Sequence, residues 1–494
     1  MVHLGAKKPQ HRKGYLFNQL SPELRKAYKE VEAQFVVSTP RLKQIVDQFV
    51  AELKEGLKSS SSNIPMLPTW VMDFPTGEET GDYLAIDLGG TNIRVILVRL
   101  LGNRKFDTIQ SKYVLPKWIR TSTSNELWLF IAQCVKTFID EEFDYRESPE
   151  DPIPLGFTFS YPAFQSRINS GVLQRWTKGF DIPDVEGHDV VPMLQDALES
   201  LGLSVVVVAL INDTTGTLVA STYTDPETKM GLIFGTGVNG AYYDTISSVS
   251  KISNALPPDI QEDASMAINC EYGAFDNNIS VLPRTKYDDT IDLESPRPGQ
   301  QSYEKMISGY YLGELLRLVL VDLHHQGHIF KGQTIGKLNE PFIMDTSFPA
   351  RIEEDPFENL CETGELFNSL GIETTVPERE LIRRICELIG TRAARLSVCS
   401  IAAICKKRGY KKAHCAADGS VFTRYPYFPD RAARALRDIF QWGHSTPDLV
   451  TVVPAEDGSG VGAAIIAALT KQRMANGESV GLDEYHPQDG KDSN

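Results

Sequence analysis

The sequence lacks the cysteine spacing of a zinc site or of a disulfide framework. Its seven cysteines are odd in number and scattered, and no two of them are spaced C-x-x-C. Disulfides persist in oxidising compartments, so this pattern favours a reduced intracellular compartment. The cysteines are Cys134, Cys270, Cys361, Cys386, Cys399, Cys405 and Cys415.

The sequence also lacks an apolar beginning. The segment "MVHLGAKKPQHRKG" has no hydrophobic core of a signal peptide, and Val2 stands where myristoylation would need a glycine. Apolar runs such as "SVVVVALI" and "VGAAIIAALT" are too short to span a bilayer. We therefore expect a cytoplasmic protein with no membrane partner.

Positive charge is scarce, because the formal net charge is -15 and the isoelectric point is about 5.2. A nucleic-acid-binding protein needs a basic face for the phosphates, so this charge argues against that class. A small polyanion could still bind through backbone amides and a metal ion, which need no positive field from the protein.

The chain does have length and an alternation of strand and helix patterns. Its 494 residues exceed what one hydrophobic core usually supports, so we expect two or more domains. After the basic tail, "ELRKAYKEVEAQF" and "LKQIVDQFVAELKEGLK" predict helices, and Ser59 to Gly81 predicts a crossing between domains. The alternation that follows predicts an α/β protein. One face of the second helix carries Leu42, Ile45, Val46, Phe49, Val50, Leu53 and Leu57.

Two glycine-containing loops indicate an internal repeat. "AIDLGGTNIRVIL" and "LIFGTGVNGAYY" each read as strand, turn and strand, although a simple β-hairpin explains the first one equally well. The second contains G-x-G-x-x-G, but "AYYDT" continues as a strand instead of opening a helix, which argues against NAD binding. "GQTIGKL" lacks the Walker A spacing. One loop in each half favours two related lobes that grip the phosphates of a nucleotide.

Several polar residues stand where strands end. Asp213, in "SVVVVALINDTTGTL", fits either a helix N-cap or a catalytic carboxylate, since α/β proteins bind ligands at the carboxyl ends of strands. Ser160 ends another strand, and Lys178 follows in "WTKGF", where a surface lysine is the alternative. Glu271 and Glu304 lie beside aromatic residues and glycines, although a solvated surface charge is the commoner role of a glutamate.

Taken in order, nine segments resemble the eukaryotic hexokinases. The resemblance covers about residues 20–475, and the single-unit length and the beginning "MVHLGAKKPQHRKG" resemble the fungal members of that family. The segments are "AIDLGGTNIRV", "LGFTFSYP", "LQRWTKGF", "VALINDTTGTL", "GLIFGTGVNGAY", "NCEYGAF", "SPRPGQQSYEKMISGYYLGEL", "AADGSV" and "EDGSGVGAA".

The resemblance implies an α/β, two-lobed actin-like ATPase (ribonuclease H-like) fold with a central cleft. It implies a division of the chain into a basic tail (1–18), N-terminal helices and a crossing segment that pack on the large lobe (19–77), the small lobe (78–212), the large lobe (213–458), a C-terminal helix that returns to the small lobe (459–480) and a polar tail (481–494).

The resemblance also implies the reaction, which is phosphorylation of D-glucose, D-fructose and D-mannose at the 6-hydroxyl by ATP with Mg²⁺, the first step of glycolysis. The implied partners are the hexose and MgATP, and we expect a monomer or a weak homodimer.

By resemblance, Asp213 is the catalytic base and Lys178 accompanies it. Buried sugar hydroxyls donate and accept hydrogen bonds at once, and carboxylates and amides can satisfy them. The implied sugar site comprises Ser160, Thr177, Lys178, Asn212, Asp213, Asn239, Glu271 and Glu304. The implied nucleotide site comprises Asp87, Gly89, Gly90, Thr91, Asn92, Lys112, Thr236, Gly419 and Ser420, with Asp87 organising Mg²⁺ through water.

Three positions depart from the family pattern. Phe164 stands where relatives usually have a small residue, Val461 where some have lysine, and Ser400 where glycine is usual. None removes a catalytic group, so these departures bear on fine specificity.

Two alternative functions remain open. A glucose-selective glucokinase differs only in the shape of the site around the second sugar carbon. A sugar-sensing regulatory protein that has lost catalysis belongs to another class, but such a descendant would be free to lose Asp213, Lys178 or the glycine loops, and all are present. A structural actin-like ATPase has no reason to carry "LQRWTKGF" and the two glutamates.

Overall fold

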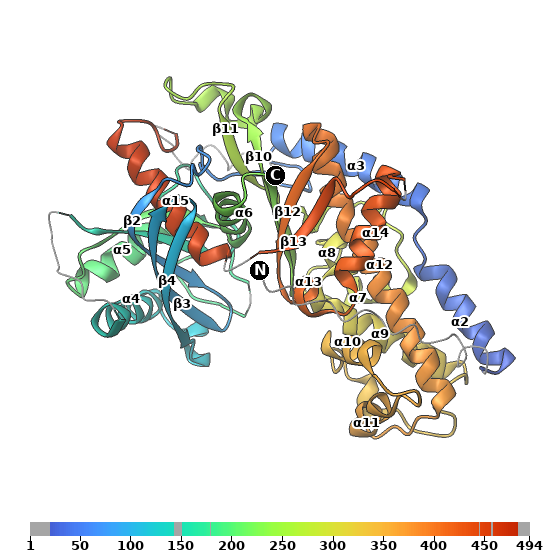
Figure 1. The fold of residues 1–494 in the computed structure, drawn as a ribbon. Helices are drawn as coiled ribbons and strands as arrows, with labels where there is room; N and C mark the ends of the chain where they lie inside the picture. Colours follow the sequence, from blue (N-terminus) through green and yellow to red (C-terminus); the bar gives the residue numbers. More distant parts are fainter. Residues whose placement is uncertain (1–19, 143–150, 178, 444, 456–457, 483–494) are drawn as a thin grey trace.

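The computed structural model describes residues 20–142, 151–177, 179–443, 445–455 and 458–482. The predicted basic tail, part of the polar tail and Lys178 therefore lie outside the described residues. Figure 1 shows two lobes side by side, each built on its own sheet with helices around it. The predicted α/β, two-lobed fold is confirmed.

The smaller sheet has the strand order β4-β3-β2-β5-β8, in which β2, β3 and β4 pair antiparallel while β2, β5 and β8 run parallel. Helices cover both faces, so β5 is buried along its whole length. The strands are β2 (Thr80–Leu88), β3 (Asn92–Gly102), β4 (Lys105–Val114), β5 (Ile153–Phe159) and β8 (Val205–Ile211).

The larger sheet repeats this topology. Its order is β1-β11-β10-β9-β12-β13, with β9, β10 and β11 antiparallel and β9, β12 and β13 parallel. The hairpin β9–β10 thus corresponds to β2–β3, which confirms the predicted repeat of two glycine-containing loops. The strands are β1 (Leu67–Pro68), β9 (Thr228–Phe234), β10 (Val238–Thr245), β11 (Ser265–Asn269), β12 (Ala413–Asp418) and β13 (Val450–Pro454). A small separate sheet pairs β6 (Ala163–Phe164) with β7 (Val172–Leu173).

Two helices, α6 (Asp213–Thr224) and α15 (Gly458–Ala475), connect the sheets. α15 packs on β2, β5 and β8 and also on α6, while α6 packs on β9 and β10 (Figure 1). Their backbones nearly touch, because a Cβ added at Gly462 would lie 2.1 Å from the carbonyl oxygen of Gly216. Only glycine permits this crossing, so the two helices form one unit between the sheets.

The N-terminal helices α2 and α3 pack on the long helix α12 of the larger lobe. The predicted apolar face of α3 is buried, except that Val50 is half-buried. α12 begins at a capping box of Thr375 and Glu378 and ends at Gly409, whose φ is +70°.

Helices complete both lobes. The remaining α-helices are α2 (Pro22–Phe35), α3 (Thr39–Lys58), α4 (Ser124–Glu142), α5 (Val190–Ser200), α7 (Lys286–Glu294), α8 (Ser302–Ile307), α9 (Gly309–His325), α10 (Ser347–Glu354), α11 (Cys361–Ser369), α12 (Val376–Arg408), α13 (Ser420–Arg424) and α14 (Phe428–Phe440). The 3-10 helices are η1 (Lys117–Thr121), η2 (Ile246–Ser248), η3 (Ser250–Ala255), η4 (Tyr272–Ala274) and η5 (Gly336–Asn339).

Most of the cysteines and the most apolar stretch of α12 are buried inside the protein. All seven cysteines are free, and all except the half-buried Cys361 are buried. Within the described ranges, α12 is the one helix long and apolar enough to cross a membrane, but 83% of its most apolar stretch is buried inside the protein. A core helix meets the same criteria, so this is weak evidence for a membrane span.

Candidate active site

The site is centred on the junction of β8 and α6. Asn212 is the N-cap of α6, and its Oδ1 accepts a hydrogen bond of 2.9 Å from the backbone N–H of Thr214. Asp213 is the first helical residue, and its Oδ1 accepts hydrogen bonds from the backbone N–H and the hydroxyl of Thr214, at 2.8 and 3.2 Å. The interpretation of Asp213 as the N-cap is therefore wrong. Its carboxylate lies at the positive end of the α6 dipole, which favours a negative charge there.

An amide and carboxylate network joins this junction to the larger sheet. The Asn239 side chain, on β10, donates to Asn269 Oδ1 at 2.8 Å, to Glu271 Oε1 at 2.9 Å and to Asn212 Oδ1 at 3.5 Å. Asn269 also donates to Glu271 Oε1 at 2.9 Å. The sequence interpretation missed Asn269, although its position two residues before Glu271, at the end of a strand, could have suggested it.

Glu304 reaches the same region from the first turn of α8. Its Oε2 accepts a hydrogen bond of 2.9 Å from the backbone N–H of Val238, the residue before Asn239. Burial raises the pKa of Glu304 to about 7, and the nearby charge of Glu271 adds to this, although the Val238 hydrogen bond opposes it. Glu271 and Glu304 are half-buried and close together, so neither is a solvated surface charge.

The smaller lobe contributes the segment that follows β5. Ser160 comes directly after β5, and because β5 and β8 are parallel neighbours, Ser160 and Asn212 lie at the same edge of the sheet. Thr177 is half-buried, and its carbonyl oxygen accepts a hydrogen bond of 3.1 Å from Phe180. Lys178 is outside the described residues.

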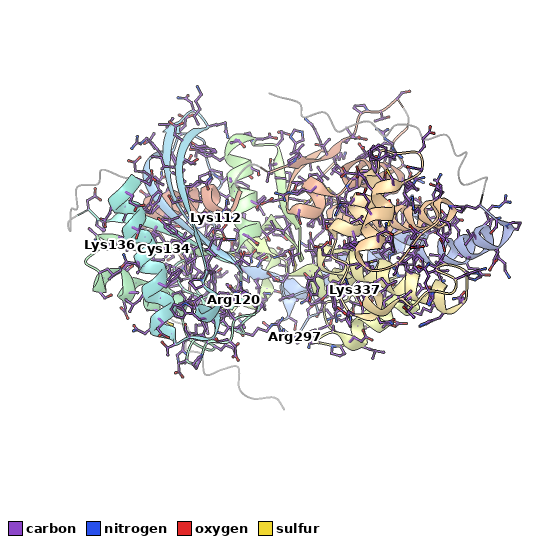
Figure 2. The ribbon with its side chains drawn as sticks, turned by 90° about the horizontal axis from the view of Figure 1, so that it is seen from below. Lys112, Arg120, Cys134, Lys136, Arg297 and Lys337 are labelled. Atoms are coloured by element: carbon purple, nitrogen blue, oxygen red, sulfur yellow. The ribbon has the colours of Figure 1, made fainter. Side chains whose placement is uncertain are left out.

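The sequence interpretation missed two arginines: Arg175, which lies near Glu271, and Arg297, which lies near Arg175. Burial lowers the pKa of Arg175, the charge of Arg297 lowers it further, and the charge of Glu271 opposes both. Arg175 belongs to the segment with Thr177, whereas Arg297 belongs to the larger lobe, where Figure 2 labels it. The "LQRWTKGF" motif could have indicated Arg175, because it lies between two predicted site segments.

The first glycine loop joins β2 to β3. The Gly89 N–H donates to the Asn92 carbonyl oxygen at 3.0 Å, and the Asn92 side chain donates to the Thr91 hydroxyl at 2.7 Å. Gly90 is half-buried and Thr91 is exposed. Asp87, near the end of β2, forms an ion pair with Arg94 at 2.5 Å and accepts a hydrogen bond of 2.8 Å from Ser459.

The second glycine loop lies against the Asp-Gly-Ser turn that follows β12. Gly419 has a φ of +104°, and a Cβ there would lie 2.4 Å from the Phe234 carbonyl oxygen and 2.7 Å from the Gly235 nitrogen. Thr236 and Ser420 are exposed beside this contact. The structure therefore brings together three predicted nucleotide residues, Thr236, Gly419 and Ser420.

Lys112 is on the other lobe. It lies on the edge strand β4 opposite Arg94, and its side chain is exposed (Figure 2). Two of the departures from the family pattern, Val461 and Ser400, are fully buried, and Phe164 is half-buried in β6.

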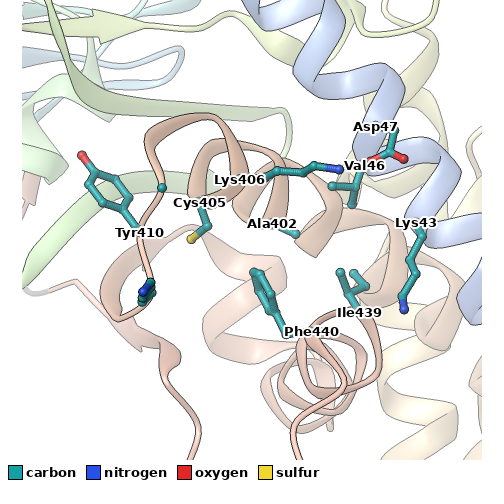
Figure 3. Close-up of a pocket in the computed structure, with 11 residues that line it drawn as sticks. Lys43, Val46, Asp47, Ala402, Cys405, Lys406, Tyr410, Ile439 and Phe440 are labelled. Carbon is teal, nitrogen blue, oxygen red and sulfur yellow. Dashed lines mark hydrogen bonds and ion pairs between the residues drawn. The ribbon is translucent and has the colours of Figure 1, made fainter.

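Two pockets in the described part of the chain lie elsewhere. One, with a volume of about 530 Å³, lies between α3, α12 and α14, and its apolar floor includes Val46, Ala402 and Phe440 (Figure 3). The other lies beside Glu23 and Lys331. Neither is lined by a predicted site residue.

Two family models described as hexokinase match residues 27–223 and 229–469. The chain is 62% identical to "Hexokinase-2" of Candida albicans over 98% of this chain and 99% of that protein. It is 63% identical to "Hexokinase-2" of Saccharomyces cerevisiae, with the same coverage of both chains. The chain belongs to the hexokinase family. The resemblance to fungal hexokinases and the interpretation of the chain as an enzyme that phosphorylates sugars are thereby confirmed.

A solved hexokinase structure agrees with this conclusion. The hexokinase from Schistosoma mansoni, complexed with glucose, superposes on this hexokinase with a TM-score of 0.79 at 33% identity. The match covers 90% of this chain and 99% of that chain.

Proposed function

We propose that this hexokinase transfers the terminal phosphoryl group of MgATP to the 6-hydroxyl of D-glucose, D-fructose and D-mannose, with Asp213 as the base. The observation that carries the proposal is the position of Asp213. Asp213 comes directly after Asn212, which accepts a hydrogen bond from Asn239. The carboxylate of Asp213 lies at the carboxyl end of β8, where parallel sheets bind ligands.

The proposed sugar site combines amide side chains with carboxylates. Asn212 and Asn239 offer both donors and acceptors, while Glu271 and Glu304 accept from sugar hydroxyls. Ser160 and Thr177 approach from the smaller lobe, and Lys178 would complete the site. A hydroxyl bound here replaces its water contacts with fixed partners, which orients it for attack.

The proposed chemical step is a direct transfer. Asp213 accepts the proton of the 6-hydroxyl while the oxygen of that hydroxyl forms a bond to the γ-phosphorus, and the bond from the phosphorus to ADP breaks. The dipole of α6 favours a negative charge on this carboxylate. Lys178 would balance charge near the oxygen.

The nucleotide is proposed to bind between the two glycine loops. Backbone amides and hydroxyls of Gly89, Gly90, Thr91 and Asn92 face it from one lobe, and those of Thr236, Gly419 and Ser420 from the other. Lys112 is proposed to reach the nucleotide as well. Backbone amides and hydroxyls bind anions without a charged side chain, which suits a polyphosphate.

The residues present fit a magnesium ion carried by the nucleotide. Within the described residues, no group of three or more His, Cys, Asp or Glu side chains could hold a metal ion. Asp87 supplies a single carboxylate, which suits contact through water because Mg²⁺ keeps several waters and binds mainly to substrate phosphates. The bound ion would neutralise phosphate charge.

The proposed mechanism divides the chain into two bodies. One lobe would comprise residues 78–212 and 459–480. The other would comprise residues 213–458 and the N-terminal helices of 19–77. Binding of the sugar would close the two lobes on each other. We further propose a cytoplasmic monomer or weak homodimer.

A coupled assay for ADP release tests the proposal. It is run with D-glucose, D-fructose, D-mannose and no sugar. We expect comparable turnover with all three sugars and little without sugar. Turnover with glucose alone would favour a glucose-selective glucokinase, and none with any sugar would favour the regulatory alternative.

A further inference from the structure

The carboxylate of Asp87 is held by one of its two oxygens. Oδ2 accepts hydrogen bonds from Arg94 Nη2 at 2.5 Å, from Arg94 Nε at 3.2 Å and from Ser459 Oγ at 2.8 Å. Arg94 Nη2 also donates to Ser459 Oγ at 2.8 Å, so the three side chains close a triangle. Within the described parts of the chain, Oδ1 of Asp87 accepts no hydrogen bond.

Ser459 belongs to the first turn of α15 and is only 6% exposed. Its carbonyl oxygen accepts a hydrogen bond of 3.0 Å from the hydroxyl of Thr158, on β5 two residues before Ser160. The same carbonyl oxygen lies 2.9 Å from where a Cβ at Gly216 of α6 would stand. One serine therefore touches the phosphate-loop strand, the strand that leads to the sugar segment, and the helix that begins with Asp213.

We propose that Ser459 is a positioning residue for the phosphoryl donor. The terminal torsion of an aspartate is broad and roughly two-fold, so a carboxylate that one arginine alone holds can rotate. The Ser459 hydroxyl donates a further hydrogen bond to Oδ2, from another side than Arg94, and so prevents this rotation. Oδ1 then stays available to the water shell of the nucleotide's metal ion. α15 thereby sets the geometry of the first phosphate loop. The inference rests on the proposed role of Asp87.

Equilibrium binding to the full chain tests this without turnover. Calorimetry with MgAMPPNP, at saturating glucose, compares the parent with Ser459→Ala and with Ser459→Cys, which nearly preserves side-chain volume but donates weakly. We expect both to bind MgAMPPNP more weakly by about tenfold or more, the factor that corresponds to one lost hydrogen bond to a charged group. Glucose affinity without nucleotide should stay within about twofold, because the sugar network does not include Ser459.

Thr158→Val is the matched control. Thr158 is the neighbour of Asp87 in the parallel pair of β5 and β2, but valine there keeps a similar shape and removes only the hydrogen bond to the Ser459 carbonyl oxygen. The hydrogen bonds to Asp87 Oδ2 stay in place, so MgAMPPNP affinity should stay close to that of the parent. Parent-like affinity in both Ser459 variants, or an equal loss in Thr158→Val, would overturn the proposal. Asp87→Ala distinguishes failure of the proposed role of Asp87 from failure of the proposed role of Ser459. If Asp87→Ala binds MgAMPPNP like the parent, the proposed role of Asp87 is wrong. If Asp87→Ala binds more weakly while both Ser459 variants bind like the parent, only the proposed role of Ser459 is wrong.

Discussion

We expect Glu304→Gln to stabilise the fold at high pH and to weaken sugar binding. Both effects depend on the protonation of the Glu304 carboxyl group. In the folded protein its pKa is raised from 4.5 to about 7, chiefly by burial. The folded state therefore binds this proton more tightly than the unfolded state, and stability from this group is lost as pH rises between these values. A difference of about 2.5 pKa units corresponds to at most roughly 3 kcal/mol.

Glutamine keeps an oxygen that can accept the Val238 N–H and carries no charge at any pH. We therefore expect the Tm of the variant, relative to the parent, to rise from pH 5 to pH 8, by a few degrees in thermal scans. Glu294→Gln, at an exposed position on α7, is the control and should show no such trend.

Sugar binding should change in the other direction. A hydrogen bond to an ionised acceptor contributes about 1.5–3 kcal/mol, so the variant should bind glucose at least about tenfold more weakly at pH 8. The glucose affinity of the parent should fall as pH drops below about 7, because the proton must leave before the sugar binds. A pH-independent Tm difference together with unchanged glucose affinity would refute this reasoning.

Three further predictions concern metal, closure and packing. Asp87→Ala should lower turnover in a way that added Mg²⁺ only partly rescues, and activity should vanish in excess EDTA; parent-like activity in EDTA would contradict the metal requirement. Saturating glucose alone should reduce the radius of gyration in small-angle scattering, because closure excludes water from a site that would otherwise hydrolyse ATP; an unchanged radius would count against closure. Gly462→Ala should lower the Tm markedly, because the added Cβ would lie 2.1 Å from the Gly216 carbonyl oxygen, whereas Gly336→Ala, at an exposed position with open space for a Cβ, should change it much less.

The sequence predicted the architecture well because its signals were local. The glycine loops 89–90 and 235–237 stand between short apolar runs, so each could be recognised as strand, turn and strand from composition alone. The repetition of one topology in both sheets then follows from the two loops. The crossing of α6 and α15 could not be predicted, since it depends on Gly216 and Gly462 meeting across the fold.

The candidate site was predicted less completely. The sequence pattern around Asp213 fitted a helix N-cap and a catalytic carboxylate equally well. In the structure the N-cap is the preceding residue, Asn212. Asn269 and the Arg94–Ser459 contact on Asp87 were missed, because hydrogen bonds between residues far apart in sequence leave no periodic signal. The raised pKa of Glu304 is likewise a property of burial.

The most direct test of the central claim is the kcat of Asp213→Asn with glucose. Asparagine retains an oxygen that can accept from Thr214, but it cannot take the proton of the 6-hydroxyl. A positioned base contributes roughly 10² to 10⁴ in rate, so we expect kcat to fall by at least about a hundredfold, with glucose affinity and Tm nearly unchanged. A variant that keeps most of its kcat would contradict the assignment of Asp213 as the base and, with it, the proposed mechanism.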